Sequence, residues 1–287
     1  MERDVALVLS SGGARGYAHI GAIEELEARG YRITSVAGTS MGALIGGVYA
    51  AGGMEQVKQW MLETDRARLL RMTDFSLSVS HIVKGERIIN ALLELLPDQR
   101  IESMPIPFCA IATDLQHGRE VVFDRGSLYA AIRASIAIPT YFSPLRTRTM
   151  LLVDGGITNP LPLNRVSRKQ GDLLVAVNVS APPDEELDRR RQRVRELRRK
   201  ALPSLLRRVL PDDEYTPANY YTILSQTIQT QIQRHTILSL RLTPPDVLCT
   251  IPANRFVGWD AYEQAKRIIR VGRLTMRRAL DEYEQGL

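Results

Sequence analysis

The sequence has little cysteine and no long hydrophobic run. Its 287 residues include only two cysteines, Cys109 and Cys249, which lie far apart in apolar surroundings and predict buried free thiols rather than a disulfide framework. Free thiols are typical of a reducing compartment. The longest stretch of small apolar residues, 41–54, is shorter than the roughly 20 residues of a membrane-spanning helix, and the N-terminal apolar run is too short for a signal peptide. We therefore expect a cytoplasmic protein.

Motifs for nucleotides and metals are also missing. Residues 11–16 fit a dinucleotide-binding loop only if Ser11 replaces its first glycine, and residues 37–39, at the end of the next strand, lack the acidic residue that binds ribose. The Gly-Lys-Ser/Thr sequence of a P-loop is absent. No group of metal-ligating residue types has a suitable spacing. The sequence therefore predicts no cofactor, no metal and no dependence on calcium.

The net charge of +6 is concentrated in one segment. Between Asp188 and Val209 lie the basic residues Arg189, Arg190, Arg191, Arg193, Arg195, Arg198, Arg199, Lys200, Arg207 and Arg208. Apolar residues in this basic stretch, 188–208, form a partial stripe that Pro203 would interrupt in a single helix. One interpretation is a solvated helix face, and the other is peripheral contact with an anionic membrane. Contact with nucleic acid is not expected, and the sequence indicates no oligomeric state.

The first 52 residues alternate between predicted strands and helices. An uninterrupted apolar run at 5–9 is typical of a strand buried on both faces, and helical spacing over 18–29 ends at Gly30. A short strand at 35–37 and a helix of small apolar residues at 41–51 follow. This βαβα unit predicts an α/β fold with a central, mostly parallel sheet and helices on both faces.

The rest of the chain divides at Pro182-Pro183. Before this point we predict a mainly helical region at 55–104, a helix at 127–138 and strands at 105–112, 120–123, 149–153 and 173–179. The strand at 173–179 is predicted to be the last, because the following residues are largely helical, with an irregular segment around Pro244-Pro245 and Pro252. We therefore predict a core at 1–180 and a mainly helical C-terminal extension at 181–287 that packs on it.

The pentapeptide Gly38-Thr39-Ser40-Met41-Gly42 is a Gly-x-Ser-x-Gly nucleophile elbow between the second strand and the second helix. The sharp strand–turn–helix connection lifts the serine hydroxyl clear of both elements. Gly38 and Gly42 are required because a side chain there would collide with the neighbouring backbone. The motif makes Ser40 the candidate nucleophile.

A glycine-rich loop, Ser10 to Gly16, follows the first strand. The adjacent Gly12 and Gly13 can direct consecutive backbone N–H groups at one anionic oxygen, such as the oxyanion of an acyl-transfer intermediate. Arg15 is close enough to brace this loop or to add positive charge. The loop is therefore a candidate oxyanion hole for Ser40.

Serine needs a base, and histidine is not well placed to provide it. Of His19, His81, His117 and His235, only His235 follows the acid, and it lies within a helical run; His19 is expected to pack beneath the site. Asp154, in Asp154-Gly155-Gly156 at a strand end, is the favoured base, giving a Ser40–Asp154 dyad at the carboxyl edge of the sheet. Asp-Gly pairs are also common in turns, and an ordinary Asp is a feeble base.

With these motifs the chain resembles the patatin-like phospholipase (PNPLA) family, closest to its small bacterial-type members. The glycine loop, the elbow and the Asp-Gly-Gly sequence match in order, together with the motifs at 112–115, 133–139 and 159–162. The resemblance spans roughly residues 5–180, and residues 246–280 are similar to a helical tail that some members carry. One departure is Ser10-Ser11, which stands where the family loop usually opens with glycine.

The resemblance implies a three-layer α/β sandwich and a hydrolase of lipid metabolism that cleaves lipid acyl esters through an acyl-enzyme. Ser40 would be the nucleophile and Asp154 the base. Gly12 and Gly13 would donate to the oxyanion, with the Met41 amide at a helix N-terminus as a helper. The supporting loop and elbow positions would be Arg15, Gly16, Gly38, Gly42, Gly155 and Gly156.

Two alternatives to hydrolysis remain open from the sequence. The same site could transfer the acyl group to another alcohol, or the glycine loop could serve a non-catalytic lipid- or anion-binding module. Residues 65–104 are a candidate acyl-chain wall or lid, with plain core packing as the alternative. Head group, chain length and positional preference are not predicted.

Overall fold

The computed structural model describes residues 3–64, 81–83, 86–201, 220–256 and 259–286. Within these ranges a sheet of eight strands has the order β10-β9-β1-β2-β4-β8-β7, and β5 pairs with β4 beside this path. Its strands are β1 (Arg3–Leu9), β2 (Tyr31–Thr39), β4 (Phe108–Asp114), β5 (Arg119–Phe123), β7 (Leu145–Arg146), β8 (Leu151–Asp154), β9 (Leu173–Ala181) and β10 (Val247–Pro252). The five strands from β10 to β4 are parallel, whereas β5, β7 and β8 are antiparallel additions.

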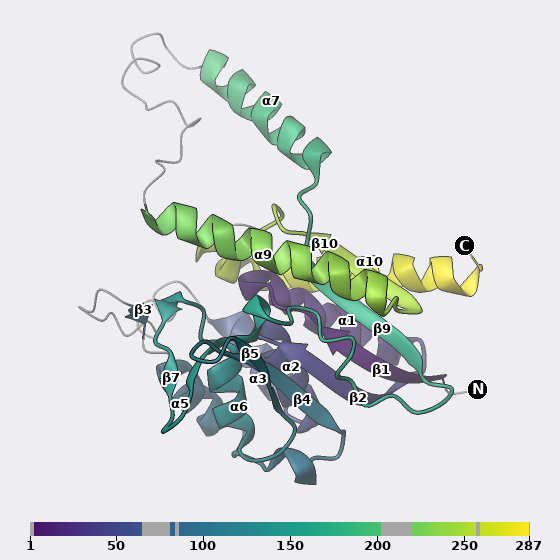
Figure 1. Cartoon of the computed structure of the whole chain (residues 1–287). Coiled ribbons are helices and arrows are strands. Elements are labelled where there is room, and N and C mark those ends of the chain that lie inside the picture. Colours follow the sequence, from purple (N-terminus) through teal and green to yellow (C-terminus); the bar gives the residue numbers. More distant parts are fainter. Residues whose placement is uncertain (1–2, 65–80, 84–85, 202–219, 257–258, 287) are drawn as a thin grey trace.

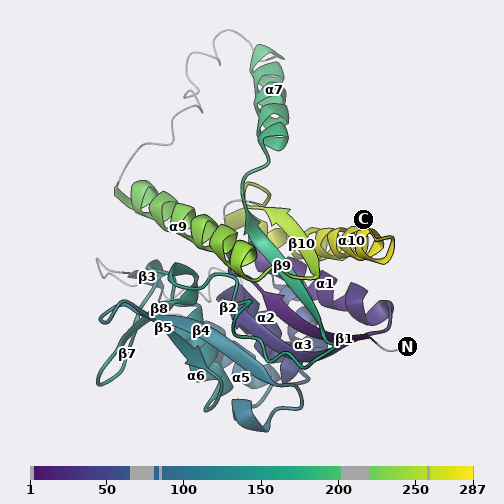
Figure 2. The ribbon, with the colours of Figure 1, turned by 45° about the vertical axis from the view of Figure 1, so that its right-hand side comes forward.

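Helices cover this sheet, except α7, which projects away from it (Figures 1 and 2). They are α1 (Tyr17–Ala28), α2 (Met41–Ala50), α3 (Met54–Glu63), α5 (Glu86–Leu95), α6 (Leu128–Ser135), α7 (Glu185–Ala201), α9 (Tyr220–Leu242) and α10 (Ala265–Glu284). Short 3₁₀ helices include η1 (Gly13–Gly16), η2 (Ile101–Ser103), η3 (Gly155–Ile157) and η4 (Trp259–Gln264). A separate parallel pair is formed by β3 (His81–Val83) and β6 (Thr140–Phe142).

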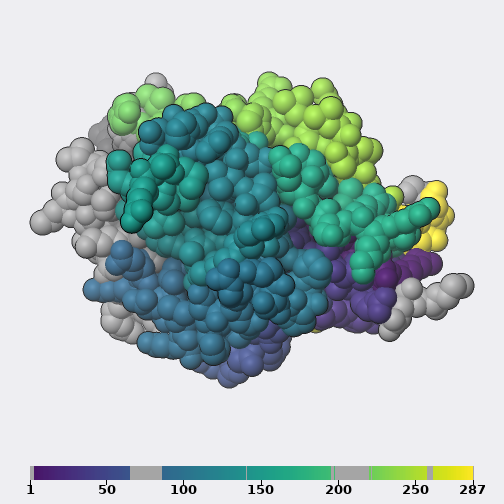
Figure 3. Space-filling view, turned by 60° about the horizontal axis from the view of Figure 1, so that its bottom comes forward, coloured from purple at the N-terminus to yellow at the C-terminus, as the bar shows by residue number. Residues whose placement is uncertain are grey.

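Both faces of the sheet are covered, as alternation along β1 shows. Leu7 and Leu9 point into the larger core, which α1, α2 and α10 share, whereas Ala6 and Val8 point to the opposite face. There they meet Leu161 and Leu163, with Leu240 of α9 packed against them. Figure 3 shows the light-green surface of α9 next to teal residues from the middle of the sequence. The predicted α/β class, with a mostly parallel sheet and helices on both faces, is confirmed.

The prediction that 173–179 is the last strand is wrong. Residues 247–252 form β10, which pairs in parallel with β9 at one edge of the sheet. The prolines that suggested an irregular segment bound this strand, and an edge strand tolerates them because its outer N–H groups need no partner. Alternate side chains, those of Val247, Cys249 and Ile251, are buried. The region 181–287 therefore adds a strand to the sheet, and its separation from 1–180 as an extension stays a prediction.

Two further boundaries differ from expectation. The helix predicted at 127–138 ends at Ser135, since residues before Pro139 are biased away from helical conformation. The mainly helical region at 55–104 contains α3, α5 and η2 but also the short β3, and residues 65–80 and 84–85 lie outside the described residues.

Three further observations concern the predicted free thiols, the basic stretch and membrane-spanning helices. Cys109 and Cys249 are buried free thiols, as predicted. The helix α7 projects away from the sheet and its covering helices (Figure 2). Across the described ranges, no helix combines the length and apolar character needed to traverse a bilayer.

Candidate active site

The elbow at Ser40 holds an unusual backbone conformation. Ser40 joins β2 to α2 with φ of 56° and ψ of −123°, a positive φ that is rare outside glycine and strained. Its N–H donates to Ser135 Oγ at 2.8 Å, and its carbonyl accepts from the amides of Ala43 and Leu44 at 2.9 and 3.0 Å. These hydrogen bonds secure the turn and begin α2, so the hydroxyl of Ser40 is held in one place.

Close backbone approaches explain the glycines of the elbow. A Cβ atom on Gly38 would overlap with the carbonyl of Gly42, and a Cβ atom on Gly42 would overlap with the carbonyl of Leu9 at the end of β1. Gly155, which follows the aspartate, lies equally close to the carbonyl of Ile111. Small residues therefore let β1, β4 and the elbow meet at one edge of the sheet.

Asp154 lies beside Ser40 at the end of β8. The Ser40 hydroxyl donates to Asp154 Oδ2 at 2.5 Å, and the Gly156 amide donates to Oδ1 at 2.7 Å. The amide of Asp154 itself donates to the carbonyl of Ala137 at 2.9 Å. Both side chains are buried. The carboxyl group is thus fixed in orientation on both of its oxygens, with one oxygen available to the serine.

Burial changes the acidity of Asp154. Loss of solvation raises its pKa to about 6, while hydrogen bonds from Ser40 and the Gly156 amide act in the opposite direction. A carboxylate with a pKa near 6 accepts a proton more readily than an ordinary aspartate and is still mostly ionised at neutral pH. The environment therefore removes the objection that aspartate is too weak a base.

The glycine loop lines the same cavity as Ser40. Gly12 precedes η1, and Gly13 adopts a φ of +55°. Among the described residues, the amides of Gly12, Gly13 and Met41 donate to no acceptor. The amide of Met41 is also at the N-terminus of α2, where the helix dipole favours negative charge. Three residues with unused N–H groups thus line the same cavity as Ser40.

Arg15 braces the loop. Its Nε donates to the Val179 carbonyl at 2.7 Å and its Nη1 to the Ala253 carbonyl at 3.0 Å, which ties η1 to the ends of β9 and β10. Desolvation lowers the pKa of Arg15 to about 10, so the side chain stays protonated at neutral pH. Gly16 ends the loop against Met41. A Cβ atom on Gly16 would overlap with the Met41 side chain, so the absence of a side chain allows this contact.

No histidine side chain in the described part of the chain hydrogen-bonds to Ser40 or Asp154. His19 lies beneath the glycine loop, where its Nε2 donates to the Ser10 carbonyl at 2.9 Å and burial lowers its pKa to about 4. It is neutral at physiological pH and packs as predicted. His117 bonds to Asp114 at the β4–β5 turn.

His235 lies on α9, and its Nδ1 is 3.2 Å from the carbonyl of Thr158. It therefore contacts the backbone beyond η3 rather than the carboxyl group. The side chain of His81 lies outside the described residues. Within the described ranges there is also no cluster of three or more residues of metal-ligating type.

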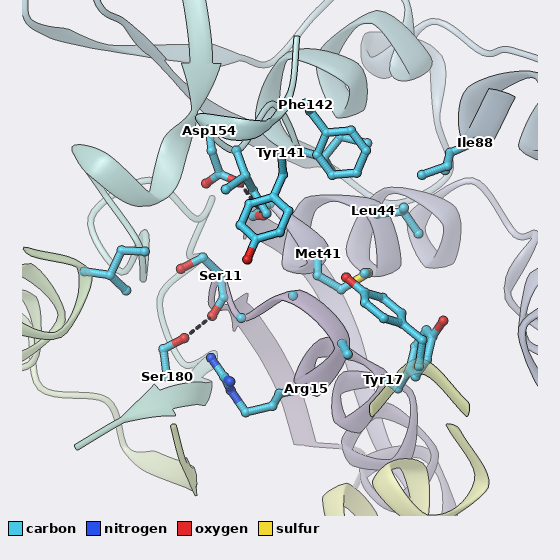
Figure 4. A pocket seen from close by; sticks show the side chains of 18 of the residues that line it. Ser11, Arg15, Tyr17, Met41, Leu44, Ile88, Tyr141, Phe142, Asp154 and Ser180 are labelled. Atoms are coloured by element: carbon cyan, nitrogen blue, oxygen red, sulfur yellow. Dashed lines mark hydrogen bonds between the residues drawn. The ribbon is translucent and has the colours of Figure 1, made fainter. Parts of the chain in front are cut away.

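Ser40 and Asp154 open into a cavity of about 370 Å³, within the usual range for a small-molecule site. Its lining is mostly apolar. Figure 4 shows Leu44 and Ile88 on one side of Met41 and the polar Ser11, Asp154 and Ser180 on the other. Labelled polar side chains therefore lie on one side of Met41, and the apolar side chains of Leu44 and Ile88 form an apolar compartment on the other.

Sequence reasoning missed much of this lining. Helix α9 was predicted as a helix, yet Ser225, Ile228, Gln229 and Ile232 form a wall of the cavity. Their spacing of three and four residues marks one helix face, but only tertiary packing shows what that face covers. From the candidate wall at 65–104, α5 contributes Ile88 and Leu92. A role as a moving lid is untested.

Comparison with known protein families identifies the family of this chain. The sequence model described as patatin-like phospholipase matches residues 7–166, more than half of the chain. The chain therefore belongs to the patatin-like phospholipase family.

The chain is also similar to parts of several known proteins. An NTE family protein of Mycobacterium tuberculosis is 47% identical over 176 residues, which cover 61% of this chain and 49% of that protein. Patatin-like phospholipase domain-containing protein 6 of Mus musculus is 30% identical over 190 residues, 64% of this chain and 14% of that protein. The chain thus spans about half the length of the mycobacterial relative, or less for the mouse protein. The crystal structure of VipD from Legionella pneumophila aligns with a TM-score of 0.49 and 16% identity, covering 98% of this chain and 67% of VipD.

Proposed function

We propose that this chain is a serine acyl hydrolase that cleaves carboxylic esters of lipids. The observation that carries the proposal is the hydrogen bond of 2.5 Å from Ser40 Oγ to Asp154 Oδ2 at the floor of a mostly apolar cavity. A strained nucleophile, a base of raised pKa and unused amides above them supply the groups that acyl transfer requires.

The reaction has two halves. Ser40 Oγ attacks the ester carbonyl carbon as its proton passes to Asp154, and the oxyanion accepts hydrogen bonds from the Gly12, Gly13 and Met41 amides. Collapse breaks the ester C–O bond, and the departing alcohol takes the proton from Asp154, leaving an acyl-enzyme. Water then attacks the acyl-enzyme as its proton passes to Asp154, and collapse releases the fatty acid while that proton returns to Ser40 Oγ.

Lipid is the proposed substrate because the cavity has a long apolar side. Residues from three helices, including Leu44 of α2, Trp60 of α3 and Leu92 of α5, can hold an acyl chain without leaving polar groups unpaired. Family membership supports the same class of substrate.

The direct test is labelling with a fluorophosphonate probe, together with hydrolysis of lipid esters. We expect the probe to label the wild type on Ser40, and Ser40→Ala to lose both labelling and turnover. Asp154→Asn keeps the shape but removes the base, and we expect at least a thousandfold loss of kcat, from the scale of losses when a member of such a catalytic unit is removed. Turnover by pure Ser40→Ala protein would refute the proposal.

We further propose peripheral contact with anionic membranes through α7. The described arginines of its first turns, Arg189, Arg190 and Arg193 among them, are exposed, and so are Val194 and Leu197. Such a helix, held away from the sheet, combines positive charge with apolar side chains. Residues 202–208 of the basic stretch lie outside the described residues, and a cytoplasmic location stays a prediction.

A further inference from the structure

Three polar side-chain atoms in the cavity wall lack a hydrogen-bond partner among the described residues. They are Ser11 Oγ, Ser225 Oγ and Gln229 Nε2, all inaccessible to bulk solvent. Ser11 is 3% exposed. Leaving such a group unpaired costs about 1–3 kcal/mol, and native proteins normally pair their buried polar atoms. A group of three on one cavity indicates a ligand that pairs with them.

One of these atoms, Ser11 Oγ, lies close to the carboxyl group of Asp154. A Cβ position built on Gly156 lies 3.0 Å from Asp154 Oδ1, 3.2 Å from Ser11 Oγ and 3.3 Å from Ile232 Cδ1. The loop serine and helix α9 therefore meet beside Gly156, two residues after Asp154. Gln229 and Ser225 lie one and two turns before Ile232 on the same face of α9.

The direction of proton transfer indicates which part of the ester lies beside Ser11 and Asp154. The proton that Asp154 takes from Ser40 must be delivered to the departing alcohol, so the alcohol part lies on the Asp154 side. The acyl chain then extends into the apolar compartment, where Figure 4 places Leu44 and Ile88 away from Ser11 and Asp154. Ser11 thus faces the alcohol part of the substrate, and Gln229 and Ser225 continue the polar lining of the cavity along α9.

We propose, resting on the hydrolase function above, that Ser11, Ser225 and Gln229 form a subsite that selects esters of hydroxyl-bearing alcohols. Hydroxyl and amide groups are neutral donors and acceptors, which match the oxygens of a glycerol unit that keeps a free hydroxyl next to the ester. A simple alkyl ester would leave them unpaired, and sites built to bind a hydroxyl discriminate against analogues that lack it. Monoacylglycerols and lysophospholipids both carry this unit.

The three subsite residues are not among the motif residues that the family shares. Two of the three lie on α9, outside residues 7–166 that match the family model, and Ser11 stands where the family loop usually has glycine. Specificity for the alcohol therefore comes from positions that belong to this chain rather than to the common motifs.

The test compares three esters of one fatty acid: the 1-acylglycerol, the 1-acyl lysophosphatidylcholine and the methyl ester. For the wild type we expect a higher kcat/KM with both glycerol esters than with the methyl ester. Gln229→Leu, Ser225→Ala and Ser11→Ala should each lower the ratio of glycerol-ester to methyl-ester kcat/KM by about 3- to 10-fold, the loss of one neutral hydrogen bond. A fall confined to one glycerol ester identifies which of the two lipids the subsite fits, and supports the proposal.

Gln226→Leu is the matched control, because Gln226 is exposed on the outer face of the same helix. It should leave the ratio unchanged. Equal losses on all three esters, or unchanged ratios in all three variants, would overturn the subsite while Ser40 still takes the fluorophosphonate label. A wild type that is neither labelled nor active would instead overturn the hydrolase function, and the subsite with it.

Discussion

Burial raises the pKa of Asp154, and this shift affects both the proposed activity and the stability of the fold. Its pKa of about 6 arises from desolvation, which neither of its hydrogen bonds fully offsets. In the proposed reaction the ionised form acts as the base, but it is the form that the folded protein solvates poorly. The same residue therefore couples the reaction and the fold to pH in opposite directions.

For activity, the expected pH profile follows ionisation of this carboxyl. We expect kcat/KM for a neutral lipid ester to be level above about pH 7 and to fall roughly tenfold per pH unit below about pH 6, because protonated Asp154 cannot accept the serine proton. Initial rates between pH 4 and pH 8 provide the measurement. A profile that falls only below pH 4 would contradict the assignment.

For stability the sign is reversed. The folded pKa lies above the ordinary value of 3.8, so the contribution of neutral Asp154 is fully present below about pH 4 and is lost as the pH rises through about 6. The resulting penalty at pH 8 is of order 3 kcal/mol. We expect Asp154→Asn to be more stable than the wild type in urea unfolding at pH 8 and about equal to it at pH 4. An Asn variant that loses stability at both pH values would show that burial of the charge is not the dominant effect.

At the scale of elements, the crossing of α1 and α10 depends on two glycines. A Cβ atom on Gly21 would overlap with the carbonyl of Ile269, and one on Gly272 would overlap with the carbonyl of Ala18. The helix backbones therefore touch, which binds the C-terminal helix tightly to the first helix of the core.

Substitution of Gly272 by alanine sets two effects against each other. Alanine favours an exposed helix by about 1 kcal/mol over glycine, but overpacking at this contact costs about 1–3 kcal/mol or more. Because a backbone carbonyl cannot rotate away, we expect Gly272→Ala to lower the melting temperature by several degrees. Arg278→Ala, on the exposed face of α10, should change it by less than about two degrees. A higher melting temperature for Gly272→Ala would show that the helices can separate freely.

Local signals explain which elements could be predicted. The β1-α1-β2-α2 unit, the elbow and the Asp-Gly-Gly turn were predictable because each depends on residues close in sequence. Strand β10 was not, since six alternating residues between prolines resemble a loop until β9 is beside them. The part of α9 in the cavity and the raised pKa of Asp154 also depend on long-range packing and burial, which no local pattern contains.

At the scale of the whole molecule, the proposed membrane contact depends on where α7 places its positive charges. Replacing Arg189, Arg190 and Arg193 by Gln should weaken sedimentation with anionic vesicles roughly a hundredfold, at about 1 kcal/mol per basic residue near the surface. Binding by the wild type should also fall as salt is raised, because the attraction is screened. Vesicle sedimentation at low and high salt measures both effects.

The control carries the same change in net charge at another place. Arg125 follows β5, Arg146 and Arg148 lie in and after β7, and all three are exposed. Their replacement by Gln should leave vesicle binding nearly unchanged. Equal loss in both triple variants, or strong binding to neutral vesicles that salt does not affect, would argue against α7 as the docking element.

The long-range assembly of the cavity has a consequence during synthesis. A growing chain that has just added Asp154 already contains the elbow and the glycine loop, yet β9 and α9 have still to be made. Since β9 pairs with β1 and α9 supplies part of the cavity lining, the pocket around Ser40 is complete only after both elements have been made.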